Sequence, residues 1–228
     1  MATLVQSSSL SCEDMKYISP YDISTALNPF RIQAGLPKLD FQCINNYSET
    51  PDNPRQNSLW PSILIYCYGI PIAELREMFG VHSEHGPCFY GDIWDYWLQP
   101  SEDHWTKHSD VSPGFYEISL RGYFPNLAWE SQEQKIRREF GSDCERASEH
   151  LLCEAFFSTW LLQEKGLLGS RSFSWTRSFL HWGRSLNSRG ERLWLSLSGS
   201  RVTINAQLPS QPRPDLAVAI SRHLDASA

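Results

Sequence analysis

The sequence predicts an α+β fold that is mostly helical, with a small antiparallel β element and a C-terminal hairpin. Apolar residues recur at helical spacing over residues 131–140 and 143–165. Apolar and polar residues instead alternate over 193–197 and 202–206, and Gly199-Ser200 between them fits a two-residue hairpin turn. Helices and a hairpin in separate parts of one chain are typical of α+β proteins.

The remaining elements are short. Residues 22–27 predict a brief helix that Asn28-Pro29 stops, because proline lacks a backbone N–H and restricts the residue before it. Alternation over 115–121 predicts a strand. A third helix is expected over 172–186, and a last short helix from Asp215.

Length and composition predict one globular domain. The 228 residues suffice for a well-packed core, and 41% hydrophobic with 20% charged residues is typical of a folded protein. We expect a flexible N-terminus over 1–20, a single globular domain over 21–208, and a Pro-rich tail with a short helix over 209–228. No apolar run approaches the roughly 20 residues of a membrane helix. Six cysteines without paired spacing favour the cytoplasm, with the nucleus as a second expected location.

A Pro-bracketed apolar segment at about 58–80 is the most distinctive feature of the chain. We expect two short helices there, at about 60–69 and 72–80, because Pro61 suits the first turn of a helix and Pro71 ends the preceding piece. An exposed amphipathic helix pair is typical of a module that docks into a groove. A buried helix pair with turn prolines is the alternative, and the pattern alone favours it.

Residues 41–100 also match the order of motifs in a known family. The matching residues are Phe41, Asn45, Asn46, Ser48, Arg55, Trp60-Pro61-Ser62-Ile63-Leu64, Pro71-Ile72-Ala73-Glu74-Leu75, Phe79-Gly80 and Tyr96-Trp97-Leu98-Gln99-Pro100. In this order they resemble the F-box-like stretch of the polerovirus silencing suppressors, the proteins of the first reading frame of those plant viruses. Trp60 stands where the family has Leu, and the six residues between Leu64 and Pro71 are fewer than usual. A rival core, Leu36-Pro37-Lys38-Leu39 with Pro51 downstream, has better spacing but carries Asp40 where an aliphatic residue is expected.

The resemblance implies a viral suppressor of host RNA silencing that is not an enzyme and needs no cofactor. It would act as an F-box-like adaptor that brings a plant ubiquitin ligase to Argonaute and promotes Argonaute degradation. The expected partners are the host Skp-type adaptor and Argonaute. The residues expected to contact the Skp-type adaptor are Leu59, Trp60, Pro61, Ile63 and Leu64, with Pro71 fixing the angle of the next helix.

A basic region over residues 171–201 supports an alternative function. Its six arginines and one glutamate give a charge of +5, so a chain with a total of −6 carries −11 elsewhere. Aromatic residues are interleaved with the arginines, which suits binding of RNA backbones and bases, although a solvated basic face is the simpler explanation. The dipeptide Trp182-Gly183 in this region is a possible Argonaute contact, for which core packing is the simpler explanation.

A series of histidines and a cysteine gives a third hypothesis, a zinc-containing accessory protein. His82, His85 and Cys88, with His104 and His108 downstream, supply imidazole and thiolate, the usual zinc ligands. Their spacing matches no strong zinc-finger pattern, so histidines of a surface loop are the simpler explanation. The chain has no nucleophile elbow, phosphate loop or dinucleotide fingerprint, and these absences predict no enzymatic activity.

Overall fold

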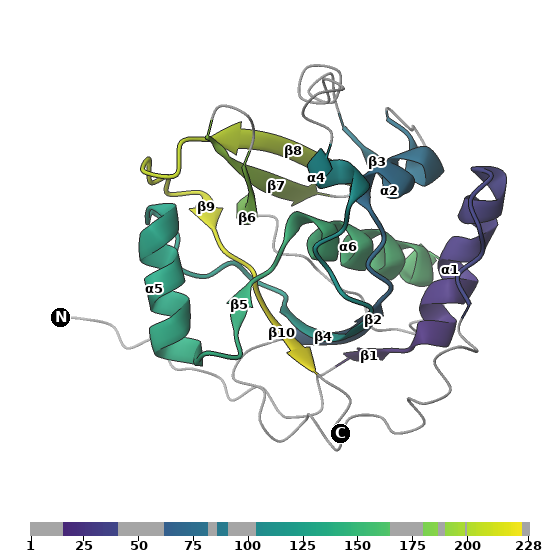
Figure 1. Cartoon of the computed structure of the whole chain (residues 1–228), viewed down its shortest axis with the longest axis horizontal. Coiled ribbons are helices and arrows are strands. Elements are labelled where there is room, and N and C mark those ends of the chain that lie inside the picture. Colours follow the sequence, from purple (N-terminus) through teal and green to yellow (C-terminus); the bar gives the residue numbers. More distant parts are fainter. Residues whose placement is uncertain are drawn as a thin grey trace.

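The protein consists of two mixed β-sheets with a buried helix between them (Figure 1). The computed structural model describes residues 16–40, 62–81, 86–90, 104–164, 180–186, 190–198 and 200–224. Sheet A contains, in spatial order, β1 (Lys16–Ile18), β2 (Ser62–Cys67), β4 (Gly114–Ser119), β10 (Ile220–Leu224) and β5 (Glu145–Arg146). Sheet B contains β3 (Cys88–Phe89), β8 (Arg201–Gln207), β7 (Arg192–Ser198), β6 (Leu180–Leu186) and β9 (Leu216–Ala217). The helices are α1 (Pro20–Gln33), α2 (Ile72–Phe79), α4 (His104–Lys107), α5 (Trp129–Phe140) and α6 (Glu149–Glu164).

The expected mostly helical fold with a small antiparallel element is wrong. The protein is α+β with two five-stranded sheets, and each sheet combines parallel and antiparallel pairs. Two segments expected to be helical are strands, and the expected C-terminal tail supplies two more. No helix in the described part of the chain is long and apolar enough to cross a membrane.

Helix α6 lies at the centre of the molecule. It contacts β2 of sheet A and both β6 and β7 of sheet B, and its side chains from Glu149 to Thr159 are buried on every side. A helix that is buried all round needs apolar residues on all faces. Leu161 and Leu162, near the end of α6, are apolar and buried as well. The helix begins later than the predicted residue 143, because Glu145–Arg146 pairs with β10 instead.

The segment 62–67, expected as part of a helix, is the buried strand β2. It pairs in parallel with β1 and antiparallel with β4, and all six of its side chains are buried. A short continuous apolar run fits a buried strand or a buried helix equally well. Pairing with the neighbouring strands decides that this run forms a strand. The second predicted helix of this segment, 72–80, is confirmed as α2.

The predicted helix over 172–186 is also wrong where the structure describes it. Residues 180–186 form β6, which pairs with β7 and with β9. Gly183 lies in the irregular part of the pairing with β7, between Trp182 and Leu186. Glycine is unfavourable within a helix but suits an irregularity in a strand. Gly183 therefore favours a strand over a helix in this segment. The rest of this predicted helix lies outside the described residues.

The C-terminal hairpin is confirmed, whereas the tail is not. Strands β7 and β8 pair over their full length, with Leu195 opposite Ile204, although Gly199 of the turn lies outside the described residues. The expected helix from Asp215 is wrong, because the apolar run 216–220 is fully buried and supplies β9 and the start of β10. Strand β10 lies between β4 and β5, so the domain extends to Leu224.

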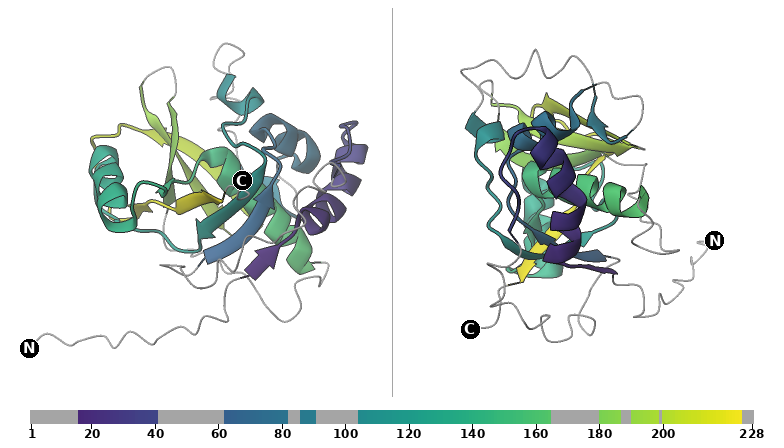
Figure 2. Two further views of the ribbon diagram at one scale, coloured as in Figure 1. Left: turned by 60° about the horizontal axis from the view of Figure 1, so that its bottom comes forward. Right: turned by 90° about the vertical axis from the view of Figure 1, so that its right-hand side faces the viewer.

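Helix α1 and helix α5 lie at opposite ends of the molecule (Figure 2). Helix α1 begins at a capping box in which Ser19 and Asp22 exchange hydrogen bonds of 3.1 Å. The predicted stop at Asn28-Pro29 is wrong, since α1 continues to Gln33 with Pro29 inside it. A proline inside a helix costs roughly 3 kcal/mol. Two hydrogen bonds between the Asn28 side chain and the backbone of Leu39 help to offset that cost.

Two further elements form where the sequence predicts them. The strand expected over 115–121 and the helix expected over 131–140 are confirmed as β4 and α5. Of the N-terminus expected to be flexible, residues 16–18 form β1 and pair with β2.

Candidate functional site

The residues expected to contact a Skp-type adaptor fall into two groups. Leu59, Trp60 and Pro61 lie outside the described residues. Ile63 and Leu64 belong to β2 and are 0% and 3% exposed. Ile63 packs in the main core, whereas Leu64 packs on the opposite face of sheet A with Tyr66 and Phe115. In this conformation neither side chain can contact a partner.

Pro71 lies at the start of α2, as the resemblance implies. It occupies the N-cap position with an extended backbone, φ −60° and ψ 144°. Helix α2 turns Ile72, Leu75 and Phe79 into the core and leaves Glu77 exposed. The helix is thus a packed part of the domain with a narrow polar surface.

A buried carboxylate holds the turn that joins β2 to α2, and sequence reasoning missed it. Glu154 of α6 is 1% exposed and accepts hydrogen bonds from the backbone N–H groups of Tyr68 at 2.6 Å and Ile70 at 2.9 Å. Burial raises the pKa of Glu154 to about 7, although these hydrogen bonds act in the opposite direction. Between them, Gly69 has φ +72°, and a Cβ there would lie 2.3 Å from the Val111 carbonyl oxygen. Only glycine fits this turn.

The rival core at Leu36-Pro37 lies on the surface beside α2. Pro37 is exposed, and its carbonyl oxygen accepts a 2.6 Å hydrogen bond from Nε of Arg31. The same guanidinium forms a 2.6 Å ion pair with Glu74 of α2. Buried Arg31 therefore connects the rival core at Pro37 to helix α2 through one side chain.

The predicted zinc ligands are only partly described. His82 and His85 lie outside the described residues, as does the side chain of His104 in α4. Cys88 is fully buried in β3, and His108 is exposed. Within the described ranges no three His, Cys, Asp or Glu side chains come close enough to hold a metal ion. The cluster at 82–88 stays a prediction.

The dipeptide Trp182-Gly183 lies within sheet B. Both residues belong to β6, and Trp182 is opposite Trp194 of β7. A segment whose backbone pairs with strands on both sides is not an extended peptide that could enter the pocket of a partner. Argonaute contact through this dipeptide stays a prediction.

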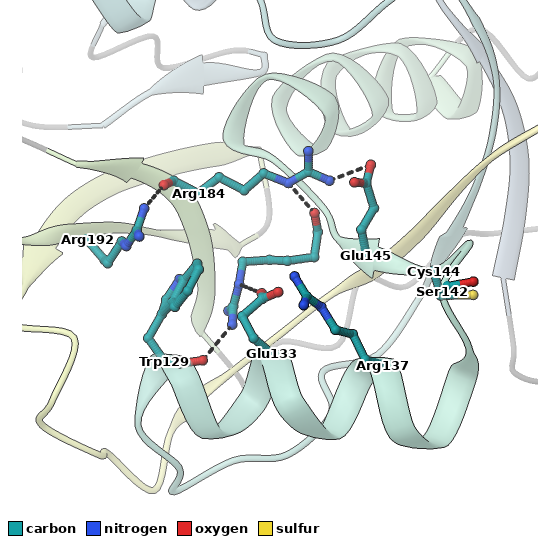
Figure 3. A pocket seen from close by; sticks show the side chains of 9 residues that line it. Trp129, Glu133, Arg137, Ser142, Cys144, Glu145, Arg184 and Arg192 are labelled. Carbon is teal, nitrogen blue, oxygen red and sulfur yellow. Dashed lines mark hydrogen bonds and ion pairs between the residues drawn. The ribbon is translucent and has the colours of Figure 1, made fainter.

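A pocket of about 490 Å³ lies between α5 and the strands β5, β6 and β7 (Figure 3). We call it the arginine pocket. Its lining residues are Trp129, Glu133, Arg137, Ser142, Cys144, Glu145, Arg146, Arg184 and Arg192. It brings Arg184 and Arg192 of the basic region together with residues of α5 that sequence reasoning missed. The only sequence signal was the spacing of Trp129, Glu133 and Arg137, which places them on one helix face.

Arg146 is the fixed centre of the arginine pocket. Its side chain is 1% exposed and forms a 2.7 Å ion pair with Glu133. It also donates to the Gln132 side chain at 3.0 Å and to the Trp129 carbonyl oxygen at 3.1 Å. Burial lowers the pKa of Arg146 to about 10, while Glu133 raises it, so the guanidinium keeps its charge at neutral pH.

Arg184 and Arg192 extend the wall along sheet B. Arg184 donates to the Arg146 carbonyl oxygen at 2.5 Å and forms a 2.6 Å ion pair with Glu145. Arg192 donates to the Arg184 carbonyl oxygen. The guanidinium carbons of Arg192 and Arg146 lie 4.0 and 4.5 Å from the centroid of the Trp129 ring. Both cations therefore lie within cation–π distance of the same indole.

The charges of the lining residues do not cancel. Glu133 pairs with Arg146 and Glu145 pairs with Arg184. Arg137 and Arg192 have no ion-pair partner within the described part of the chain. Burial, with the charge of Asp143, raises the pKa of Cys144 to about 11, so this thiol is neutral and a poor nucleophile. The pocket carries a net charge of +2 and suits an anion.

Comparison with protein families, with curated proteins and with solved structures finds no match to this chain. The resemblance over residues 41–100 therefore supports a proposal and assigns no family.

Proposed function

We propose that the protein is a viral suppressor of host RNA silencing that works as an F-box-like adaptor in the host cytoplasm. The observation that carries this proposal is the order of motifs over residues 41–100, from Asn45-Asn46 to Tyr96-Trp97. The short helix that the motif requires after Pro71 agrees with α2. The protein brings a Skp-type adaptor and Argonaute together, and it accelerates degradation by raising the local concentration of ligase near its target.

We assign the contact with the Skp-type adaptor to Leu59, Trp60 and Pro61. Ile63 and Leu64 are buried in β2 and serve the core. The three preceding residues adjoin that strand in sequence, and a tryptophan is the type of residue that most often dominates the binding energy of an interface. Pro71 retains the role of starting α2 at a fixed angle.

A pull-down of a plant Skp-type adaptor tests this assignment. The full-length double variant Trp60→Ala/Pro61→Ala should capture at least about tenfold less adaptor than the wild type, since a lost hot-spot aromatic costs 2 kcal/mol or more. The matched control is Leu36→Ala/Pro37→Ala at the rival core, where Leu36 is half-buried and Pro37 is exposed, and it should keep its capture. Melting temperatures of both variants show whether folding is intact.

The outcomes separate the site from the function. Loss of capture only in the Leu36→Ala/Pro37→Ala variant would move the contact to the rival core. Capture that is absent even for the wild type, together with an unchanged Argonaute level in a leaf silencing assay, would refute the adaptor function.

RNA binding is the second candidate function, and one observation favours it. Arg184 and Arg192 of the basic region converge on one pocket with Arg137 instead of scattering over the surface. A gel shift with small RNA at increasing salt distinguishes this function. Binding driven by phosphate contacts weakens steeply as salt rises, whereas a docked apolar segment responds little.

A further inference from the structure

We propose that the arginine pocket binds a terminal phosphate group, either that of inorganic phosphate or the phosphate monoester of a nucleotide. The proposal does not rest on the adaptor function, because no residue of the pocket belongs to the segment 41–100.

The charge of the pocket matches this ligand. Four arginines and two glutamates line it, and the two ion pairs leave Arg137 and Arg192 without a carboxylate. A phosphate monoester carries a charge of about −1.5 to −2 at pH 7, which two guanidiniums neutralise. Planar guanidinium groups also suit phosphate oxygens geometrically, since they donate two parallel hydrogen bonds.

The wall of the pocket is already in place before a ligand binds. Arg146 is held by Glu133, Gln132 and the Trp129 carbonyl oxygen. Arg184 is held by Glu145, as Figure 3 shows, and it also donates to the Arg146 carbonyl oxygen. These fixed charges raise the potential in the pocket without spending side-chain entropy on binding. Arg137 is exposed and supplies donors from the α5 side.

The aromatic ring of the pocket is already in contact with two of its arginines. The guanidinium carbons of Arg146 and Arg192 lie 4.5 and 4.0 Å from the centroid of the Trp129 ring. Single-stranded RNA binders combine basic grooves with open aromatic faces. The arginine pocket is instead a single concavity of about 490 Å³, not a groove that follows a strand over several nucleotides. Recognition should therefore depend on a compact phosphate group.

Calorimetry on the full-length protein with inorganic phosphate, AMP and adenosine tests the proposal. We expect saturable binding of phosphate and of AMP, and none of adenosine. Arg137→Ala should weaken binding at least about tenfold, because it removes a charge-assisted hydrogen bond to the phosphate. Arg137 is exposed and unpaired in the described chain, so this variant should fold normally.

Arg138→Ala is the matched control. Arg138 is the next residue of α5, its side chain is 70% exposed, and it does not line the pocket. It should bind phosphate like the wild type. Comparable affinities for phosphate and AMP would identify the phosphate alone as the recognised group, and tighter AMP binding would identify a nucleotide.

Three results would overturn the proposal. They are no saturable phosphate binding at millimolar concentration, equal weakening by Arg138→Ala and Arg137→Ala, and adenosine binding as tight as AMP binding. Competition of phosphate with an RNA that lacks terminal phosphates would instead assign the pocket to a continuous backbone.

Discussion

The F-box-like segment and the arginine pocket differ in how their residues are distributed along the sequence. The residues 62–80 are contiguous, apolar and recognisable as a motif, yet the structure uses most of them to build the core. The arginine pocket has no motif, and its residues come from α5, β5, β6 and β7. A recognisable sequence pattern can thus mark a structural element, while a concave charged site can arise from segments that carry no pattern.

The two regions also depend on different forces. Sheet A beneath α6 is stabilised by apolar burial, and Ile63, Ile65 and Ile118 are all fully buried there. Around the arginine pocket the buried groups are ionic, with Arg146 and Glu133 in contact at 2.7 Å. Apolar burial should tolerate changes of salt and pH, whereas buried ion pairs are costly to break from one side.

The largest effect is expected in the apolar region. Ile63→Asp, or Leu195→Asp in sheet B, places an unpaired charge at a fully buried position and should lower the free energy of unfolding by more than about 4 kcal/mol. Urea denaturation followed by circular dichroism measures this. Ile32→Asp is the matched control, because Ile32 of α1 is 54% exposed, and its change should stay near 0.5 kcal/mol. A small loss for Ile63→Asp would show that β2 is not in the core.

A somewhat smaller effect is expected in the ionic region. Arg146→Met removes the buried cation and leaves Glu133, whose side chain is 22% exposed, without its partner. This should cost about 3 kcal/mol in urea denaturation, the low end of the range for a buried pair. The double variant Arg146→Met/Glu133→Leu removes both charges and should be more stable than the single variant. A single-variant loss below about 1 kcal/mol would show that the pair is exchangeable with water.

Local sequence patterns predicted the elements that depend on local interactions. Helices α2 and α5 and the β7–β8 hairpin follow from periodicity and turn chemistry within about 15 residues of chain. The wrong predictions concern β2 and β6, whose state depends on partners far away in sequence. Strand β2 pairs with β4 some fifty residues later, and that partner is invisible to a local pattern.

The candidate sites show the same limit. The sequence analysis found the basic region that contains Arg184 and Arg192, but no pattern connects these residues to Trp129 or Arg146. Their proximity follows from β5, which contacts both α5 and β6. Ile63 and Leu64 were assigned to a partner surface because apolar residues beside a proline fit a docking helix and a core strand alike.

The smallest of the expected effects concerns Glu154, a buried carboxylate of α6. Its pKa is about 7 in the folded protein, raised by burial from the 4.5 of the free group, and His150 one turn earlier on α6 acts in the opposite direction. Between these two values the folded state binds more protons than the unfolded state, so stability falls as pH rises from 4.5 to 7 and is level above that. The decrease should be roughly 3 kcal/mol.

Urea denaturation from pH 4.5 to 8 on the wild type and on Glu154→Gln measures this decrease. Glutamine keeps one acceptor for the turn at Tyr68–Ile70 but places an amide NH₂ against the second backbone N–H, so it should cost about 1–3 kcal/mol at low pH. The cost should shrink as pH rises, because the wild type then loses the stability that its protonated carboxyl provided. Two stability curves that run parallel over this range would show that Glu154 is ionised throughout, and that the turn between β2 and α2 binds a permanent charge.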